Sequence, residues 1–232
     1  MINIFGEEEL KEVVFKIRSE ENTQFIVRNQ DWFKNEFYEK IQSIRTSEEW
    51  KSLAPWLPES TQGKLEMYNP LVMSKMFLLN DARIFDKFES EHLYWIDAAL
   101  STTVSMGYFT SDNVLDKLLD KISKFLFICF PYEANTEIHG FAYPEINTYT
   151  RGKDIKMVAR GGFFGGPVDT IGEINAKYYD LMSTTLNEGY MGTEESLFSL
   201  LTYQFPNKVC YSKIEENGLL YYFFEQLKND EV

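Results

Sequence analysis

Apolar runs and amphipathic stretches alternate along this chain of 232 residues, and that alternation most constrains its fold. Apolar residues three and four positions apart predict helices over 31–44, 69–81, 111–125, 170–186 and 194–203. Short runs rich in apolar, β-branched and aromatic residues predict strands over 23–28, 92–97 and 156–160. Such alternation favours an α/β fold with a mostly parallel central sheet flanked by helices.

Four other segments complete this outline. Residues 7–18 predict a short acidic helix, 47–63 predict a loop because of two prolines, 131–155 have no clear pattern, and 219–224 predict a packing segment. The length suits one domain over residues 1–232.

Charge and composition exclude several classes of protein. The formal net charge of −13 argues against nucleic-acid binding, although a small basic pocket could still hold one diphosphate. Cys129 and Cys210 lack CxxC spacing, so a zinc site is not favoured, and Cys129 is predicted to be a buried apolar residue. The first residues do not resemble a signal peptide and no apolar window could span a bilayer. We therefore expect a cytoplasmic protein, with peripheral contact at the inner face of the membrane left open.

Asp97 is the first candidate for chemistry, because it closes the apolar run 92–96 at an expected carboxyl end of a strand. Ligands of open α/β sheets bind at that edge. A carboxylate there can hold a divalent cation, which neutralises a diphosphate. The alternative is an aspartate that caps a helix or forms a turn.

Lys75 lies on the apolar face of the helix predicted for 69–81, near Leu71, Val72 and Leu78. Burying an unpaired ammonium group is costly. The side chain therefore extends to solvent, pairs with a protein carboxylate, or meets a ligand phosphate.

Glycines crowd the segment that follows the strand predicted at 156–160. They are Gly161, Gly162, Gly165 and Gly166. Glycine lets the backbone approach a ligand closely or adopt a positive φ, and Phe163 adds an apolar wall. The spacing is not GxGxxG and no P-loop lysine follows, which argues against a dinucleotide or ATP site. A turn or bulge in the sheet explains the same glycines.

The segment Thr193-Glu194-Glu195 is typical of a helix start, with threonine as the cap and glutamates in the first turn. A carboxylate kept ionised there could also accept a proton from a sugar hydroxyl as a general base. His92 and His139 are the only histidines, and neither suggests a Ser/His/Asp triad.

Four blocks, in order, resemble the HtrL/YibB family of bacterial surface-glycan proteins. They are residues 68–75 (YNPLVMSK), 94–98 (YWIDA), 161–166 (GGFFGG) and 191–195 (MGTEE). The similarity runs over roughly residues 15–206. It implies a GT-A-type glycosyltransferase that moves a sugar from a nucleoside diphosphate donor (a UDP- or GDP-sugar) to a glycan or lipid-linked acceptor. Polysaccharide or lipopolysaccharide biosynthesis is the implied setting.

The resemblance also implies roles for the residues. Asp97, with Trp95 and Ala99 on either side, stands where the DxD motif holds the donor diphosphate and a Mn²⁺ or Mg²⁺ ion. Lys75 would add positive charge near the donor. Arg160 with glycines 161–166 would shape the sugar and acceptor site. Thr193 opens the acidic motif, in which Glu195 would be the base and Glu194 would orient the acceptor.

Three departures from the pattern affect this expectation. Ala99 replaces the second aspartate of DxD, no histidine follows residue 139, and the amino-terminal part is short. The alternative is therefore a degenerate member that binds nucleotide or glycan without turnover. The transferase interpretation requires Asp97 and the two glutamates to face one open cleft rather than be sealed in core ion pairs.

Overall fold

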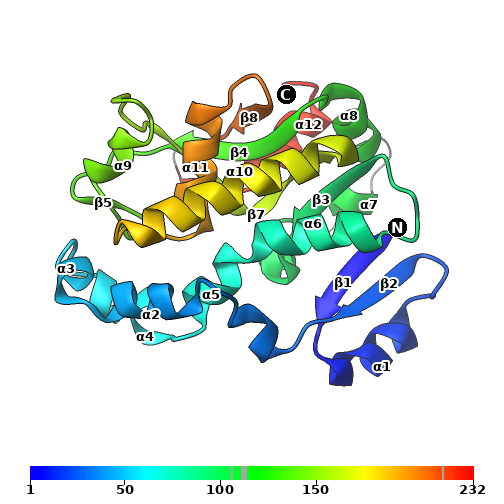
Figure 1. The fold of residues 1–232 in the computed structure, drawn as a ribbon. Helices are drawn as coiled ribbons and strands as arrows, with labels where there is room; N and C mark the ends of the chain where they lie inside the picture. The colour runs from blue at the N-terminus through cyan, green and yellow to red at the C-terminus, as the bar shows by residue number, and fades with distance from the viewer. Residues whose placement is uncertain (106, 111–113, 216) are drawn as a thin grey trace.

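Figure 1 shows the computed structural model of the chain, which describes residues 1–105, 107–110, 114–215 and 217–232. The strands are β1 (Ile2–Gly6), β2 (Thr23–Val27), β3 (His92–Ile96), β4 (Phe125–Pro131), β5 (Glu137–Ile138), β6 (Phe141–Ala142), β7 (Met157–Pro167) and β8 (Val209–Lys213). The α-helices are α1 (Glu8–Ile17), α2 (Tyr38–Thr46), α3 (Glu48–Lys51), α4 (Thr61–Lys64), α5 (Tyr68–Met73), α6 (Lys75–Phe85), α7 (Gly107–Thr110), α8 (Val114–Lys121), α9 (Glu145–Thr148), α10 (Val168–Asn187), α11 (Glu194–Gln204) and α12 (Tyr221–Lys228). Short 3₁₀ helices are η1 (Gln30–Phe33), η2 (Leu57–Glu59) and η3 (Ala98–Thr102).

The main sheet has the strand order β3-β7-β4-β8 and is mixed. β7 runs antiparallel to both β3 and β4, whereas β4 and β8 are parallel. The α/β class is confirmed, but the expectation of a mostly parallel sheet is wrong. The connection between β4 and β7 contains the β5–β6 hairpin and α9 but no long helix that crosses the sheet. It returns the chain to the end of the sheet at which β4 finished, where Pro131 pairs with Met157. A strand that starts at the end where its neighbour finished runs antiparallel to that neighbour.

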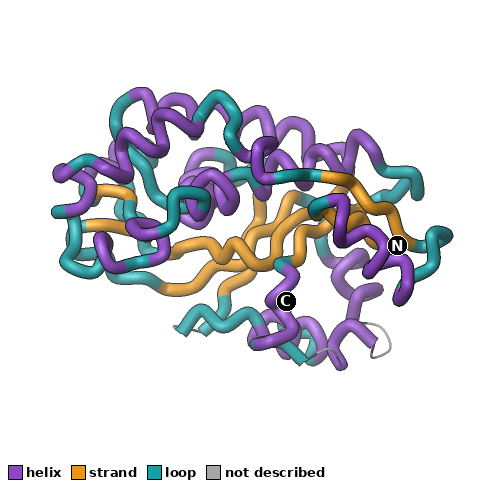
Figure 2. Tube along the Cα trace, turned by 90° about the horizontal axis from the view of Figure 1, so that it is seen from below, coloured by secondary structure: helices purple, strands orange, loops and turns teal. Residues whose placement is uncertain are grey.

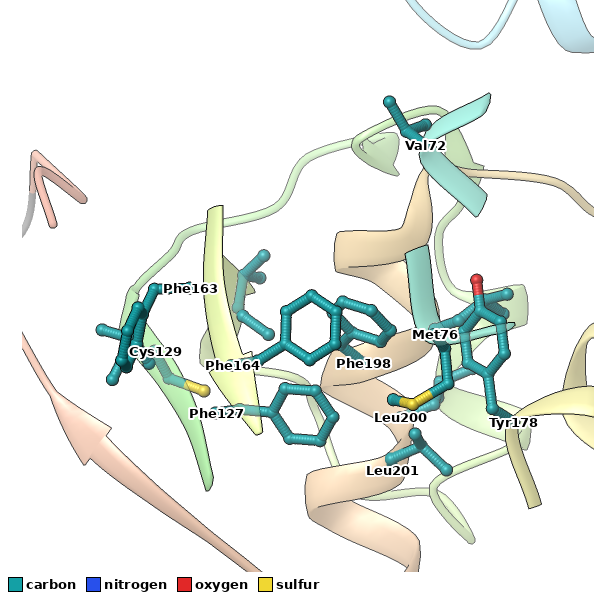
Figure 3. Packing of buried hydrophobic residues seen from close by; sticks show 14 of the residues in the cluster. Val72, Met76, Phe127, Cys129, Phe163, Phe164, Tyr178, Phe198, Leu200 and Leu201 are labelled. Carbon is teal, nitrogen blue, oxygen red and sulfur yellow. The ribbon is translucent and has the colours of Figure 1, made fainter. Parts of the chain in front are cut away.

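Helices cover both faces of this sheet. α6, α10 and α11 lie on one face, and α12 with α8 lies on the other (Figures 1 and 2). Successive residues of β7 project to opposite faces, as strand geometry requires. The Phe164 ring lies 4.7 Å from that of Phe198 on α11 (Figure 3). The Phe163 ring lies 5.6 Å from that of Phe223 on α12. The predicted packing role of the tail is therefore confirmed, and so is the burial of Cys129.

A small parallel sheet, β1–β2, joined by α1, lies beside the main sheet near β3 (Figure 1). The Phe5 ring stacks on Trp95 of β3 at 6.5 Å. Arg28 also pairs with Asp81 of α6 at 2.6 Å. These contacts hold the amino-terminal unit against β3, which Asp97 follows, and against α6.

Several predicted elements have the expected bounds within two or three residues. α1, β2, β3, α10 and α11 are the clearest cases. The helix predicted over 69–81 instead forms α5 and α6, which meet at Ser74. The Ser74 hydroxyl donates to the Pro70 carbonyl at 2.7 Å, a type of bond that bends helices.

Other local predictions need correction. The helix predicted over 31–44 is split into η1 and α2, and the Asn29 side chain caps η1 by accepting from the Trp32 amide. The loop predicted over 47–63 contains α3, η2 and α4. The predicted start of the helix over 111–125 lies outside the described residues; α8 is its described part, and Phe125 already belongs to β4.

The glycine segment 161–166 lies inside β7 and is not a loop. Its pairing with β4 is irregular, because Phe127 pairs with Phe164 while the next residue, Ile128, pairs with Arg160. Gly165 has φ +147°, and a Cβ there would lie 2.2 Å from the Leu93 carbonyl oxygen. The irregular pairing supports the bulge alternative for residues 161–163, which lie between the paired Arg160 and Phe164. Among the described residues, no helix combines the length and apolarity needed to cross a bilayer.

Candidate functional site

Asp97 follows directly after β3, where its amide donates to the Gly162 carbonyl at 3.0 Å. The Trp95 indole Nε1 donates to Asp97 Oδ1 at 2.6 Å, because residues two apart on a strand share a face. About a third of the Asp97 side chain (34%) is exposed. Asp97 is thus held in place by its neighbours and still open to a ligand.

Lys75, the first residue of α6, contacts Asp97 with its ammonium group. Its ammonium nitrogen lies 2.9 Å from Asp97 Oδ2, 2.8 Å from Glu194 Oε1 and 3.2 Å from the Gly161 carbonyl oxygen. An ammonium group has three protons, so all three have protein acceptors. Burial favours the neutral amine, but the charges of Glu194 and Asp97 outweigh it and raise the pKa of Lys75. Of the three environments considered for Lys75, the structure shows pairing with protein carboxylates.

Glu194 opens α11 and is nearly sealed, with 5% of its side chain exposed. Burial raises the pKa of Glu194 to about 7, while the ammonium of Lys75 opposes that rise. Gly161 leaves room for this carboxylate, since a Cβ there would lie 2.1 Å from Glu194 Oε1. Glu194 is therefore an internal partner of Lys75, and only its edge reaches the cavity.

Glu195 lies beside it, held by three donors. The Gly161 amide donates to Oε1 at 2.8 Å, and Arg160 Nη1 and His139 Nδ1 lie 3.2 and 2.6 Å from Oε2. Burial acts to raise the pKa of Glu195, but the hydrogen bond from His139 and the charge of Arg160 bring it below its usual range. The predicted Thr193 cap is confirmed, because its hydroxyl accepts from the Glu195 amide.

His139 is the functional candidate that sequence reasoning missed. It occupies, with Gly140, the two-residue turn between β5 and β6, and the two residues have φ of +50° and +91°. A tight turn of this kind has positive φ at both positions, a conformation that is uncommon for any residue other than glycine. The dipeptide His139-Gly140 between Glu137-Ile138 and Phe141-Ala142 was the signal available in the sequence. A strained residue of this kind points to a functional position.

These side chains line one cavity of about 590 Å³. Of the residues predicted from sequence, it is lined by Lys75, Asp97, Ala99, Arg160, Gly162, Thr193, Glu194 and Glu195. Its remaining wall includes His139, Gln62, Trp56, Tyr68 and Tyr132. The cavity thus brings Asp97 at the end of β3 and Glu195 at the start of α11 together, as the transferase interpretation requires. For Glu194 the requirement is not met, because this carboxylate is nearly sealed in an ion pair with Lys75.

Other predicted site residues lie behind this surface. Trp95 and Gly161 act through hydrogen bonds to Asp97, Lys75 and Glu195. Phe163 is 1% exposed and belongs to the core, and Gly165 and Gly166 pack inside the sheet.

The surroundings of Asp97 bear on whether it could hold a divalent cation. Both of its oxygens already accept from protein donors, Trp95 and Lys75, and an ammonium group occupies the space beside Oδ2. Within the described residues, no group of three or more His, Cys, Asp or Glu side chains is placed to hold a metal ion. The residues present therefore do not fit a cation held by the protein alone.

Comparison with known proteins adds one finding. No curated protein and no solved structure matches the chain significantly. A family model described as "Bacterial protein of unknown function (HtrL_YibB)" matches residues 1–215. Since that match covers most of the chain, the protein belongs to the HtrL_YibB family.

Proposed function

We propose that this protein is a GT-A-like glycosyltransferase that moves a sugar from a nucleoside diphosphate donor to a glycan hydroxyl. The observation that carries the proposal is the shared cavity: Asp97 from the end of β3 and Glu195 from the start of α11 both line it. A carboxylate that is about one-third exposed (Asp97) and a proton-accepting carboxylate (Glu195), both beside a cavity of about 590 Å³, suit transfer of a sugar to a hydroxyl.

In this proposal the donor binds at the Asp97 side of the cavity. Asp97 has unused lone pairs and can accept hydrogen bonds from donor hydroxyls. Lys75 acts indirectly, because its three protons hold Asp97, Glu194 and Gly161 in place. No step is assigned to a divalent cation, because the residues present do not fit one.

Arg160 lies between the two ends of the site. Its Nη1 contacts Glu195, whereas its Nε is buried without a partner among the described residues. An unmet buried donor is costly, so an oxygen of a bound ligand would stabilise it. Arg160 is the cationic group we assign to the sugar–phosphate oxygens, where charge develops as the diphosphate leaves.

The acceptor binds at the opposite end, near Glu195 and His139. Trp56 and Tyr132 line this cavity, and aromatic rings offer flat apolar surfaces for the C–H face of a sugar. The carboxylate–imidazole pair of Glu195 and His139 receives the proton of the attacking hydroxyl.

Activity can be tested with UDP-glucose, UDP-galactose and GDP-mannose as donors, methyl glycosides as acceptors, and Mn²⁺ either added or chelated. Release of nucleoside diphosphate that depends on the acceptor supports the proposal. We expect Asp97→Asn to lower the rate at least 100-fold without changing the circular dichroism spectrum. The matched control is Asp116→Asn, an exposed residue of α8, which should retain the full rate. An unchanged rate in Asp97→Asn would remove Asp97 from the site.

A second candidate is a binding protein that holds nucleotide or glycan without turnover. The observation that favours it is the internal pairing of charge: Lys75 is saturated by protein acceptors, and Ala99 stands in place of a second carboxylate. In that case UDP or a glycan would raise the melting temperature with no release of product. A ligand at a hundredfold excess over Kd stabilises by about 2.7 kcal/mol, which a thermal-shift assay detects.

A further inference from the structure

The acceptor end of the cavity contains two groups that could take a proton, Glu195 and His139. They differ in how many of their lone pairs already accept hydrogen bonds. Glu195 Oε2 faces both His139 Nδ1 and Arg160 Nη1, and Oε1 accepts from the Gly161 amide. Those donors stabilise the ionised carboxylate and make it a weaker base. The same contacts leave only one lone pair of Glu195, on Oε1, without a donor.

His139, in contrast, uses one ring nitrogen to donate to Glu195 and has the other free to accept. An ionised carboxylate only accepts hydrogen bonds, so His139 Nδ1 carries the proton of the 2.6 Å contact with Glu195. In the neutral imidazole, Nε2 then has a free lone pair. Within the part of the chain that the structure describes, His139 Nε2 has no hydrogen-bond partner, and the ring lines the cavity.

The backbone around His139 is held in place from two sides. The His139 carbonyl accepts from the Thr193 amide at 3.1 Å, and the Ser196 hydroxyl donates to the Ile138 carbonyl at 2.8 Å. Both contacts tie the β5–β6 turn to the first turn of α11, which also carries Glu195. The Tyr132 ring packs edge-on against the imidazole at 5.4 Å. The position of Nε2 is therefore set by the same element that positions the carboxylate.

A second unsatisfied acceptor lies next to this turn. Gln62 is 6% exposed, lines the cavity, and its Oε1 has no donor among the described residues. A Cβ on Gly140 would lie 2.7 Å from that oxygen, so the amide lies against the His139-Gly140 turn. A buried acceptor without a donor favours a ligand that supplies hydroxyl groups.

We propose that His139 is the general base for the acceptor hydroxyl and that Glu195 is the positioning residue that holds its tautomer. The inference rests on the proposed function. The acceptor O–H bond breaks as its proton moves to Nε2, and the oxygen bonds to the anomeric carbon. The bond from that carbon to the diphosphate breaks, and its electron pair leaves with the diphosphate. Glu195 stabilises the imidazolium, which later returns the proton to water.

The inference is tested with His139→Gly, because glycine accepts the positive φ and leaves space for free imidazole. With a donor and methyl glycoside that the wild-type protein uses, kcat should fall about 10²–10⁴-fold, with KM changed by less than threefold. Added imidazole should restore at least a tenth of the lost rate in His139→Gly. It should not do so in Glu195→Gln, whose own histidine is still present. His92→Gln, which changes the other histidine of the chain, should behave as wild type.

Several results would overturn the inference while leaving the proposed function intact. One is a His139→Gly protein that keeps the wild-type kcat. Another is a rate loss without imidazole rescue, which indicates a structural role. A third is a Glu195→Gln protein whose kcat falls at least 100-fold below that of His139→Gly, which makes Glu195 the base. If His139→Gly does not fold, His139→Asn tolerates the same φ and must show the same fall in kcat. A wild-type protein that transfers no sugar at all refutes the proposed function instead.

Discussion

Replacing Lys75 by methionine should destabilise the protein in a strongly pH-dependent way. Methionine keeps the apolar stem of the lysine but removes the ammonium group that neutralises Glu194. Glu194 is 5% exposed, so water cannot take the place of that group, whereas Asp97 is exposed enough to be rehydrated. Removing one partner of a buried ion pair typically costs 3–5 kcal/mol.

The size of the destabilisation in Lys75→Met follows from the Glu194 carboxyl group, which remains buried. Without Lys75, the cheapest state of the buried Glu194 is the protonated one. Its ordinary pKa is 4.5, so protonating it at pH 7 costs about 3 kcal/mol, at about 1.4 kcal/mol for each pH unit. At pH 5 the same cost is about 0.7 kcal/mol. The folded-state pKa of Glu194 is raised, so the penalty from this group in Lys75→Met is smallest below pH 4.5 and grows as the pH rises.

Urea unfolding at pH 5 and pH 7, monitored by the fluorescence of the four tryptophans, measures how much the free energy of unfolding of Lys75→Met differs from that of the wild type at each pH. The double variant Lys75→Met/Glu194→Gln should recover most of the loss at pH 7, because no buried charge remains. Lys64→Met is the control: it breaks the exposed pair with Glu59 and should change the free energy of unfolding by less than about 1 kcal/mol. Equal destabilisation of Lys75→Met at pH 5 and pH 7 would refute the reasoning.

Two further predictions concern the backbone behind the site and the cation. Gly161→Ala should lower the free energy of unfolding by about 2–4 kcal/mol, because its Cβ would lie 2.1 Å from Glu194 Oε1 and displace the carboxylate from Lys75. Gly172→Ala, within α10, should be neutral or stabilising by up to about 1 kcal/mol, and a Gly161→Ala protein as stable as wild type would contradict the close approach. Calorimetric titration with Mn²⁺ and no nucleotide should show no saturable binding below about 1 mM, because the Lys75 ammonium beside Asp97 Oδ2 repels a cation and each Asp97 oxygen already accepts one hydrogen bond. One Mn²⁺ bound per chain at micromolar Kd, and lost in Asp97→Asn, would show that the cation predicted from sequence does bind at Asp97.

Local patterns were sufficient for the parts of the site that depend on neighbours in the chain. The Thr193 cap and the glutamates of the first turn of α11 were predictable, because capping involves residues two or three apart. Asp97 at the end of β3 was predictable in the same way, from the apolar run before it. The convergence of the two segments on one cavity was expected only from the family resemblance.

Contacts between distant segments were not predictable from those patterns. A helical wheel placed Lys75 on an apolar face but could not choose among solvent, carboxylate and phosphate, because its partners Asp97 and Glu194 are 22 and 119 residues away. His139 looked unremarkable because Glu195 lies far along the sequence. The direction of β7 was mispredicted because alternating helices and strands do not specify on which side a long connection returns.

The sequence alone therefore determined the mixed α/β class, the family, the helix that begins at Glu194 and the carboxylate at Asp97. Only the tertiary structure decided the antiparallel placement of β7, the pairing of Lys75 with two carboxylates, and the contact between His139 and Glu195. The physical reason is the separation along the chain of the residues that interact. Periodicity and capping act over one or two turns of chain, whereas the ionisation and exposure of a buried side chain depend on whichever distant groups the packed core brings within hydrogen-bonding distance.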